Sequence, residues 1–275
     1  MLKGMLVGLD GSAFSDSAVS LGLEWAKGSG AVLAGQAVVD RPGLTAPDAV
    51  AAGSGFFKLN ERELVEAQAK ADELLARFAA RCTEAGVTAR TRRDVGDPAT
   101  AILAQAQRYD LILLGLETRF RAMPGGSPCD TLDKVLHSPP RPVVAVPAEL
   151  GTGRTAVIGY DGSLQAARTL ATYIATGLAA NYQNVVVTID EAYEDAAEVA
   201  QVAAEYLTLH GVAVTALPVE TRLDPAAVLL DHAHRHETGL VVMGAFGHSA
   251  LRQFFFGSTT RGVLQKSRVP VFLYH

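Results

Sequence analysis

One octapeptide occurs twice and decides the fold: it reads Met5-Leu6-Val7-Gly8-Leu9-Asp10-Gly11-Ser12 and then Ala156-Val157-Ile158-Gly159-Tyr160-Asp161-Gly162-Ser163. Each copy is an apolar run that ends in Asp-Gly-Ser. An alanine-rich amphipathic stretch follows each copy, to about Lys27 and about Ala180. This order is typical of a buried strand, a tight turn and a helix.

Three further segments recur in the same order. Residues 97–103 resemble 224–230, residues 111–115 resemble 240–244, and residues 142–146 resemble 270–274. Four matches in one order, at similar spacings, indicate a tandem duplication. We therefore expect two domains, at 1–149 and 154–275, joined by the short Gly-Thr-Gly segment at 151–153.

The first copy is the longer one. The two Asp-Gly-Ser aspartates lie 151 positions apart, whereas the two Asp-Pro pairs lie 127 apart, so the first copy carries roughly two dozen extra residues. We place them around residues 41–59. A loop is expected there because the stretch contains Pro42, Gly43, Pro47, Gly53 and Gly55.

Apolar runs alternate with helical patterns along the second copy. The runs are 156–160, 184–189, 212–219, 239–244 and 269–274, and the helical stretches are 164–180, 191–210, 225–236 and 258–267. Near-continuous apolar strands separated by helices predict a parallel sheet covered on both faces. We expect an α/β fold of two tandem, Rossmann-like, doubly wound open parallel sheets of about five strands each. Ligands of such sheets bind beyond the carboxyl ends of the strands.

Composition excludes several classes of protein. The 275 residues are 49% hydrophobic and 19% charged, with a mean hydropathy of +0.18, which is enough to bury a core. The net charge of −5 argues against a nucleic-acid or membrane-surface binder, because both need a positive field. No apolar run approaches the ~20 residues of a membrane span, and no secretory leader is evident. The chain has only two cysteines, Cys82 and Cys129, which are too few for the disulfide framework of a small secreted protein. We therefore expect a cytoplasmic protein.

A glycine-bearing loop follows the fourth strand of the second copy. It runs from Gly244 through Gly247 and His248 to Gly257-Ser258-Thr259, where a helix begins. We expect Gly257 to adopt the left-handed conformation that turns backbone N–H groups inward. Those N–H groups, the two hydroxyls and the helix dipole would together form an anion site suited to phosphate.

At these residues the sequence resembles the universal stress protein family in its tandem two-domain form. The nucleotide signature of that family is Gly, two residues, Gly, nine residues, Gly, and then Ser or Thr. Gly244, Gly247, Gly257 and Ser258 match it without a gap. The resemblance covers essentially the whole chain, and it implies a fold similar to that of adenine-nucleotide α-hydrolases.

The resemblance implies ATP as the ligand, alone or with magnesium. It implies that Asp161, in the Asp161-Gly162-Ser163 turn, approaches the ribose or adenine, and that Thr188-Ile189-Asp190 line the adenine pocket. Gly244, Gly247 and His248 would border the ribose and α-phosphate, and Gly257, Ser258 and Thr259 would hold the other phosphates. A purely structural alternative stays open, in which Asp161, Ser163, Ser258 and Thr259 only cap helices.

The first copy departs from the signature. Gly115 is kept, but Thr118 stands at the second glycine, and Cys129-Asp130 stand in place of Gly257-Ser258. An aspartate at that turn would repel phosphate. Gly126-Ser127 offer a displaced alternative, and Arg119 with Arg121 could pair with phosphate. We expect the first copy to be altered or not to bind, with a regulatory or dimerisation role.

Three weaker patterns are read as structural. His232 and His236 share a helix face, as in zinc-binding helices, but the sequence places no third ligand. Cys129 has no neighbouring base, and Phe254-Phe255-Phe256 fit packing or an interface.

The two copies are expected to pack as a pseudo-twofold pair with their last strands adjoining. A homodimer of whole chains stays open.

The sequence is compatible with three classes of function. The sequence favours an ATP-binding stress-response or signalling module with slow or no hydrolysis, because it has no GxxxxGK[ST] motif to supply a phosphate-binding lysine. The alternative is an enzyme that hydrolyses ATP or adenylates a substrate in the same pocket. Such an enzyme would need a Ser-Gly-Gly type of first turn, which neither Asp-Gly-Ser provides. A ligand-free scaffold is the third class.

Overall fold

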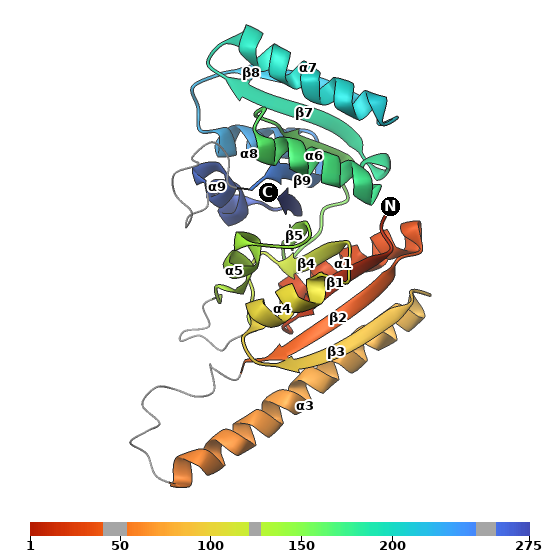
Figure 1. Cartoon of the computed structure of the whole chain (residues 1–275), viewed down its shortest axis with the longest axis vertical. Coiled ribbons are helices and arrows are strands. Elements are labelled where there is room, and N and C mark those ends of the chain that lie inside the picture. Colours follow the sequence, from red (N-terminus) through yellow and green to blue (C-terminus); the bar gives the residue numbers. More distant parts are fainter. Residues whose placement is uncertain (41–53, 121–127, 246–256) are drawn as a thin grey trace. The chain divides into compact units, whose positions relative to one another are not determined.

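The computed structural model describes residues 1–40, 54–120, 128–245 and 257–275, with side chains left out for 54–61. The chain divides into two compact units (Figure 1). The N-terminal unit is Leu2–Arg141, and the C-terminal unit is Pro142–His275 together with Met1.

The N-terminal unit contains a four-stranded parallel sheet. Its strands are β1 (Gly4–Leu9), β2 (Val32–Val39), β3 (Ala89–Val95) and β4 (Leu111–Gly115), in the order β3-β2-β1-β4. Its helices within the described residues are α1 (Ala13–Ser29), α3 (Ser54–Glu84), α4 (Pro98–Ala106) and α5 (Thr131–His137). Strands β1 and β4 are buried along their whole length, as expected for a sheet covered on both faces.

The C-terminal unit repeats this arrangement. Strands β6 (Thr155–Gly159), β7 (Gln183–Asp190), β8 (Val214–Glu220), β9 (Thr238–Gly244) and β10 (Val271–Tyr274) are parallel, in the order β10-β9-β6-β7-β8. The helices are α6 (Leu164–Thr176), α7 (Tyr193–Leu209), α8 (Pro225–Arg235) and α9 (Ser258–Lys266). The predicted α/β class and the doubly wound parallel sheets are confirmed.

A sixth strand joins the C-terminal sheet from the first copy. Strand β5 (Val143–Val146) pairs antiparallel with β10, so that Val144 lies opposite Phe272. The expected neighbourhood of the two last strands is therefore observed. All four residues of β5 are buried, and the pairing removes what would be an apolar edge on β10.

The recurring sequence motifs are helix starts. Ser12 and Ser163 cap α1 and α6, where their hydroxyls accept hydrogen bonds of 3.2 Å from the N–H groups of Ser15 and Ala166. Asp97 caps α4 and Asp224 caps α8, and in both helices proline follows at the first helical position, where no N–H is needed.

The insertion in the first copy is only partly a loop. Helix α3 begins at Ser54, so residues 54–59 of the predicted 41–59 loop are helical, and residues 41–53 lie outside the described residues. Helix α3 has 31 residues where its counterpart α7 has 17. Its sequence is rich in Ala, Glu, Leu, Lys and Arg, strong helix formers that outweigh the single Gly55. About half of the extra length therefore extends a helix.

No helix within the described ranges is long and apolar enough to cross a membrane.

Candidate functional site

A cavity of about 480 Å³ lies in the C-terminal unit, where the carboxyl ends of β6, β7 and β9 meet the first turns of α6, α8 and α9. This volume is within the range of small-molecule sites, ~300–1,000 Å³. Nine of the twelve residues predicted for the site line it: Asp161, Ser163, Thr188, Ile189, Asp190, Gly244, Gly257, Ser258 and Thr259. Gly162 is not among the lining residues. Gly247 and His248 lie outside the described residues.

The turn after β6 has a defined local geometry. The Oδ1 atom of Asp161 accepts a 3.0 Å hydrogen bond from the N–H of Ser163. Gly162 has φ +74°, in the left-handed region that favours glycine, and a Cβ there would lie 3.5 Å from Cγ1 of Val199 on α7. Asp161 and Ser163 both line the cavity, and Ser163 also caps α6. Its capping role and its place at the site coexist.

The end of β7 forms the second wall. Thr188 is 3% exposed, and its hydroxyl donates a 2.9 Å bond to the carbonyl of Tyr160. Asp190 accepts a 3.1 Å bond from the N–H of Ala192. Burial, followed by the charge of Asp161, raises the pKa of the Tyr160 phenol. The end of β7 thus lines the cavity with two apolar side chains, one hydroxyl and one carboxylate.

The start of α9 forms the third wall. Gly257 is the N-cap, and no side chain caps the helix, so neither Ser258 nor Thr259 acts as a capping residue. The expected left-handed conformation of Gly257 is wrong: its φ is −55° and its ψ is 149°. An N-cap residue adopts extended backbone of this kind, which places no special demand on glycine. The first N–H groups of α9 have no partner within the helix, and the helix begins at the cavity.

Residues outside the predicted set, most of them apolar, complete the wall. Val187, Val199, Leu229 and Met243 line the cavity, as do Tyr160 and Thr260. None of the described lining residues is lysine or arginine. Most of these residues lie near strand ends or one turn into a helix. That position is a signal from which they could have been predicted as lining residues. The cavity therefore combines an apolar slot with an amide- and hydroxyl-bearing end.

At the same place in the N-terminal unit, Phe120 approaches the end of β1. Gly8 corresponds to Gly159, which lines the cavity, and a Cβ on Gly8 would lie 2.9 Å from Cζ of Phe120. Thr118 and Cys129 form an antiparallel bridge, in which the N–H of Cys129 donates 2.7 Å to the carbonyl of Thr118. Arg121 and Gly126-Ser127 lie outside the described residues.

The histidine pair on α8 and Cys129 contact neighbouring side chains. The rings of His232 and His236 stack with centroids 6.0 Å apart, and burial lowers the pKa of His232. The sulfur of Cys129 lies 3.3 Å and 3.2 Å from the hydroxyls of Thr118 and Thr131. Among the described residues, no group of three His, Cys, Asp or Glu side chains could hold a metal ion. Phe254-Phe255-Phe256 lie outside the described ranges.

Comparison with known proteins identifies relatives along the whole chain. The sequence profile described as "Universal stress protein family" matches residues 1–147 and 154–275. Universal stress protein Slr1230 of Synechocystis sp. is 26% identical over 167 residues, or 60% of this chain. That alignment spans 58% of the curated relative, less than two thirds of its length.

Two solved structures share the fold over nearly the full length. A universal stress protein from Archaeoglobus fulgidus superposes with a TM-score of 0.74 at 21% identity, covering 98% of this chain and 97% of that one. A protein of unknown function from Pseudomonas aeruginosa superposes with a TM-score of 0.64 at 16% identity, covering 99% and 92%. At these identities the likeness concerns the fold.

Proposed function

Because the chain belongs to the universal stress protein family, we propose that its C-terminal unit binds ATP and acts as a stress-response or signalling module with slow or no hydrolysis. The observation that carries this proposal is the cavity. Nine of the residues that the family resemblance assigns to the nucleotide converge on one space of about 480 Å³.

The apolar part of the cavity suits the adenine base. Val187, Ile189, Val199 and Leu229 offer flat apolar contact, and the base would be held between the strand ends and α7. Asp161 stands at the turn after β6, where its carboxylate can accept hydrogen bonds from ribose hydroxyls or from the adenine amino group. Thr188 and Asp190 limit the pocket on the far side.

The polar part suits the phosphates. The uncapped N-terminus of α9 supplies N–H groups and the positive end of a helix dipole, and Ser258, Thr259 and Thr260 add hydroxyls. Gly244, Gly247 and His248 are assigned to the ribose and α-phosphate. The carboxylates of Asp161 and Asp190 would meet magnesium if the nucleotide enters as its metal complex.

We propose that the N-terminal unit binds no nucleotide. Phe120 lies against Gly8, and Asp130 stands where Ser258 would hold phosphate. In this proposal the domains are residues 1–149 and 154–275, paired as an internal pseudo-dimer in which only one pocket is functional. The N-terminal domain then supports regulation or association.

Calorimetric titration with ATP tests the proposal through its stoichiometry. One ATP per chain is expected, whereas two would overturn the assignment of the N-terminal unit, and none would favour a ligand-free scaffold. Gly257→Asp places a negative charge at the phosphate end and should abolish binding. Gly28→Asp, on α1 where nothing lies within 4 Å of the added Cβ, is the matched control and should bind ATP normally. Rapid release of phosphate from ATP would favour an enzyme instead.

A further inference from the structure

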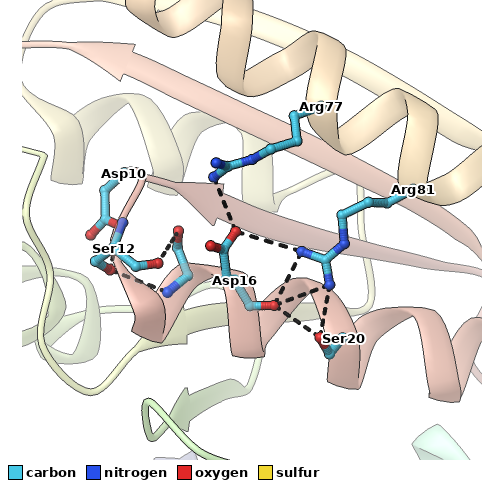
Figure 2. A network of polar contacts seen from close by, with 7 residues as sticks. Asp10, Ser12, Asp16, Ser20, Arg77 and Arg81 are labelled. Carbon is cyan, nitrogen blue, oxygen red and sulfur yellow. Dashed lines mark hydrogen bonds and ion pairs between the residues drawn. The ribbon is translucent and has the colours of Figure 1, made fainter.

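A polar network fastens α3 to α1 in the N-terminal unit (Figure 2). Asp16 on α1 lies 3.1 Å from the guanidinium of Arg77 and 3.5 Å from that of Arg81, both on α3. Arg81 also donates a 2.8 Å hydrogen bond to the hydroxyl of Ser20. The two arginines line one small space together with apolar residues of both helices, among them Val19 and Leu74.

The C-terminal unit has apolar residues at all four of these positions. Helices α1 and α6 align through their caps, Ser12 and Ser163, and helices α3 and α7 each end five residues before the next strand begins. Leu74 on α3 and Val199 on α7 then face the equivalent glycines, which supports the alignment. In the order Asp16, Ser20, Arg77 and Arg81, the counterparts are Ala167, Ala171, Val202 and Tyr206.

Two of these counterparts, Val202 and Tyr206, are exposed on α7, and so is Leu209. Val202 is 54% exposed, Tyr206 36% and Leu209 85%. Helical spacing places them on one side of α7, and the same spacing places Asp195, Glu198 and Glu205 beside them. We call these six residues the α7 ridge: Asp195, Glu198, Val202, Glu205, Tyr206 and Leu209.

The ridge is strongly acidic. Helix α7 carries Glu194 as well as the three acidic residues of the ridge and no lysine or arginine, and Arg168 is the one basic residue of α6. Among the described residues, none of these four carboxylates forms an ion pair, and Glu205 accepts a 3.0 Å hydrogen bond from Gln201. An apolar row bordered by uncompensated negative charge is therefore presented outward.

We propose that the α7 ridge is a docking surface for a basic amphipathic helix of a partner protein. The apolar face of such a helix would pack along Val202, Tyr206 and Leu209, as one helix packs on another. Its lysines or arginines would pair with Glu198 and Glu205, and aromatic Tyr206 would be the central anchor. A second copy of this chain fits less well, because two acidic ridges would face each other, and anionic lipid would be repelled for the same reason.

The probe is a synthetic helix-forming peptide about four turns long, with leucines on one face and lysines on the other. A peptide with glutamate for every lysine is its matched partner. We expect the lysine peptide to bind the full chain, with affinity that falls as salt is raised, and the glutamate peptide to bind at least about tenfold more weakly. Equal binding of both peptides, or no binding of the lysine peptide, would overturn the proposal.

Three variants assign the binding to the ridge. Tyr206→Ala should weaken the lysine peptide about tenfold by loss of the central anchor. The triple variant Ala167→Asp, Val202→Arg, Tyr206→Arg rebuilds the network of the N-terminal unit and should abolish binding with no loss of thermal stability. Val65→Arg, at a 63% exposed position on α3 of the other unit, should bind like the unaltered chain. Equal binding by all variants, or a dimer in sedimentation that Val202→Arg dissociates, would show that the surface has another occupant.

Discussion

The backbone N–H of Arg119 donates a 2.6 Å hydrogen bond to Oδ2 of Asp10. The other oxygen of Asp10 accepts from the N–H and the hydroxyl of Ser12, at 2.9 Å and 2.6 Å. Asp10 thus ties the segment after β4 to the turn after β1, at the place where the C-terminal unit has its cavity. In the N-terminal unit, the aspartate of the Asp-Gly-Ser turn serves the fold.

Asp10→Asn should therefore destabilise the N-terminal unit. An amide has one oxygen, so its NH2 group would face either the N–H of Arg119 or the donors of Ser12, at a cost of about 1–3 kcal/mol in the free energy of unfolding. Asp190→Asn is the comparison variant and should cost less, because an amide oxygen can still accept from the N–H of Ala192. Urea denaturation of both variants measures the difference. Equal losses would show that Asp10 has no special structural role.

Phe120→Ala removes the side chain that lies against Gly8. Because Phe120 is only partly buried, we expect a loss of about 1–3 kcal/mol, less than for a fully buried phenylalanine. The stoichiometry of ATP should stay at one, since Asp10 is still engaged by Arg119 and the Thr118–Cys129 bridge remains. Thermal unfolding and calorimetric titration check the two expectations. A second equivalent of ATP would mean that Phe120 alone closes the N-terminal site.

Gly244→Ala tests the close approach of β9 to α6. A Cβ at Gly244 would lie 2.9 Å from the backbone nitrogen of Ala166 and 3.0 Å from the carbonyl carbon of Gln165. These are backbone atoms of the first turn of α6, so the turn must move, at a cost of about 1–3 kcal/mol. ATP affinity should fall with it, because Ser163 and Asp161 precede that turn.

Gly28→Ala is the control for this crowding. Nothing lies within 4 Å of the added Cβ, and the position is helical, so alanine should raise stability by up to about 1 kcal/mol. Denaturation midpoints of the two alanine variants give the comparison. If Gly244→Ala is as stable as the unaltered chain, then α6 adjusts freely and its first turn does not fix the site.

Local signals account for the part of the fold that the sequence predicts well. Helix α8 was expected at 225–236 and runs from Pro225 to Arg235, because Asp224-Pro225 is a cap and a first helical residue in one motif. Strand β9 was expected at 239–244 and begins one residue earlier. Both depend on neighbours in the chain.

The parts that escaped prediction depend on distant residues. The φ of Gly257 is set by its place as N-cap of α9, and glycine at that position does not reveal which conformation is used. The ring of Phe120 reaches Gly8 across more than a hundred residues, and no local pattern marks that contact. The apolar wall of the cavity is likewise assembled from separate strand ends. The convergence of nine predicted residues required only the order of the strands.

Tyr173 makes the free energy of unfolding depend on pH in the alkaline range. Its side chain is fully buried, its hydroxyl donates a 3.1 Å bond to Oδ1 of Asn184, and its ring meets that of Phe272 edge-on at 5.6 Å. Burial raises the pKa of Tyr173 well above its ordinary value of 10.0. The unfolded chain releases the proton near pH 10 while the folded chain retains it, so this contribution is complete below that pH and falls as the pH rises further.

Tyr173→Phe should remove this contribution to the pH dependence. At neutral pH the variant is expected to be about 1–2 kcal/mol less stable, because Oδ1 of Asn184 loses its donor. Above about pH 10 the gap should narrow, since only the unaltered chain gains free energy from ionising this tyrosine on unfolding. Urea denaturation of both proteins from neutral to alkaline pH measures the gap, and the other tyrosines cancel in the comparison. A gap that stays constant would mean that the phenol of Tyr173 ionises in the folded protein as readily as in the unfolded one.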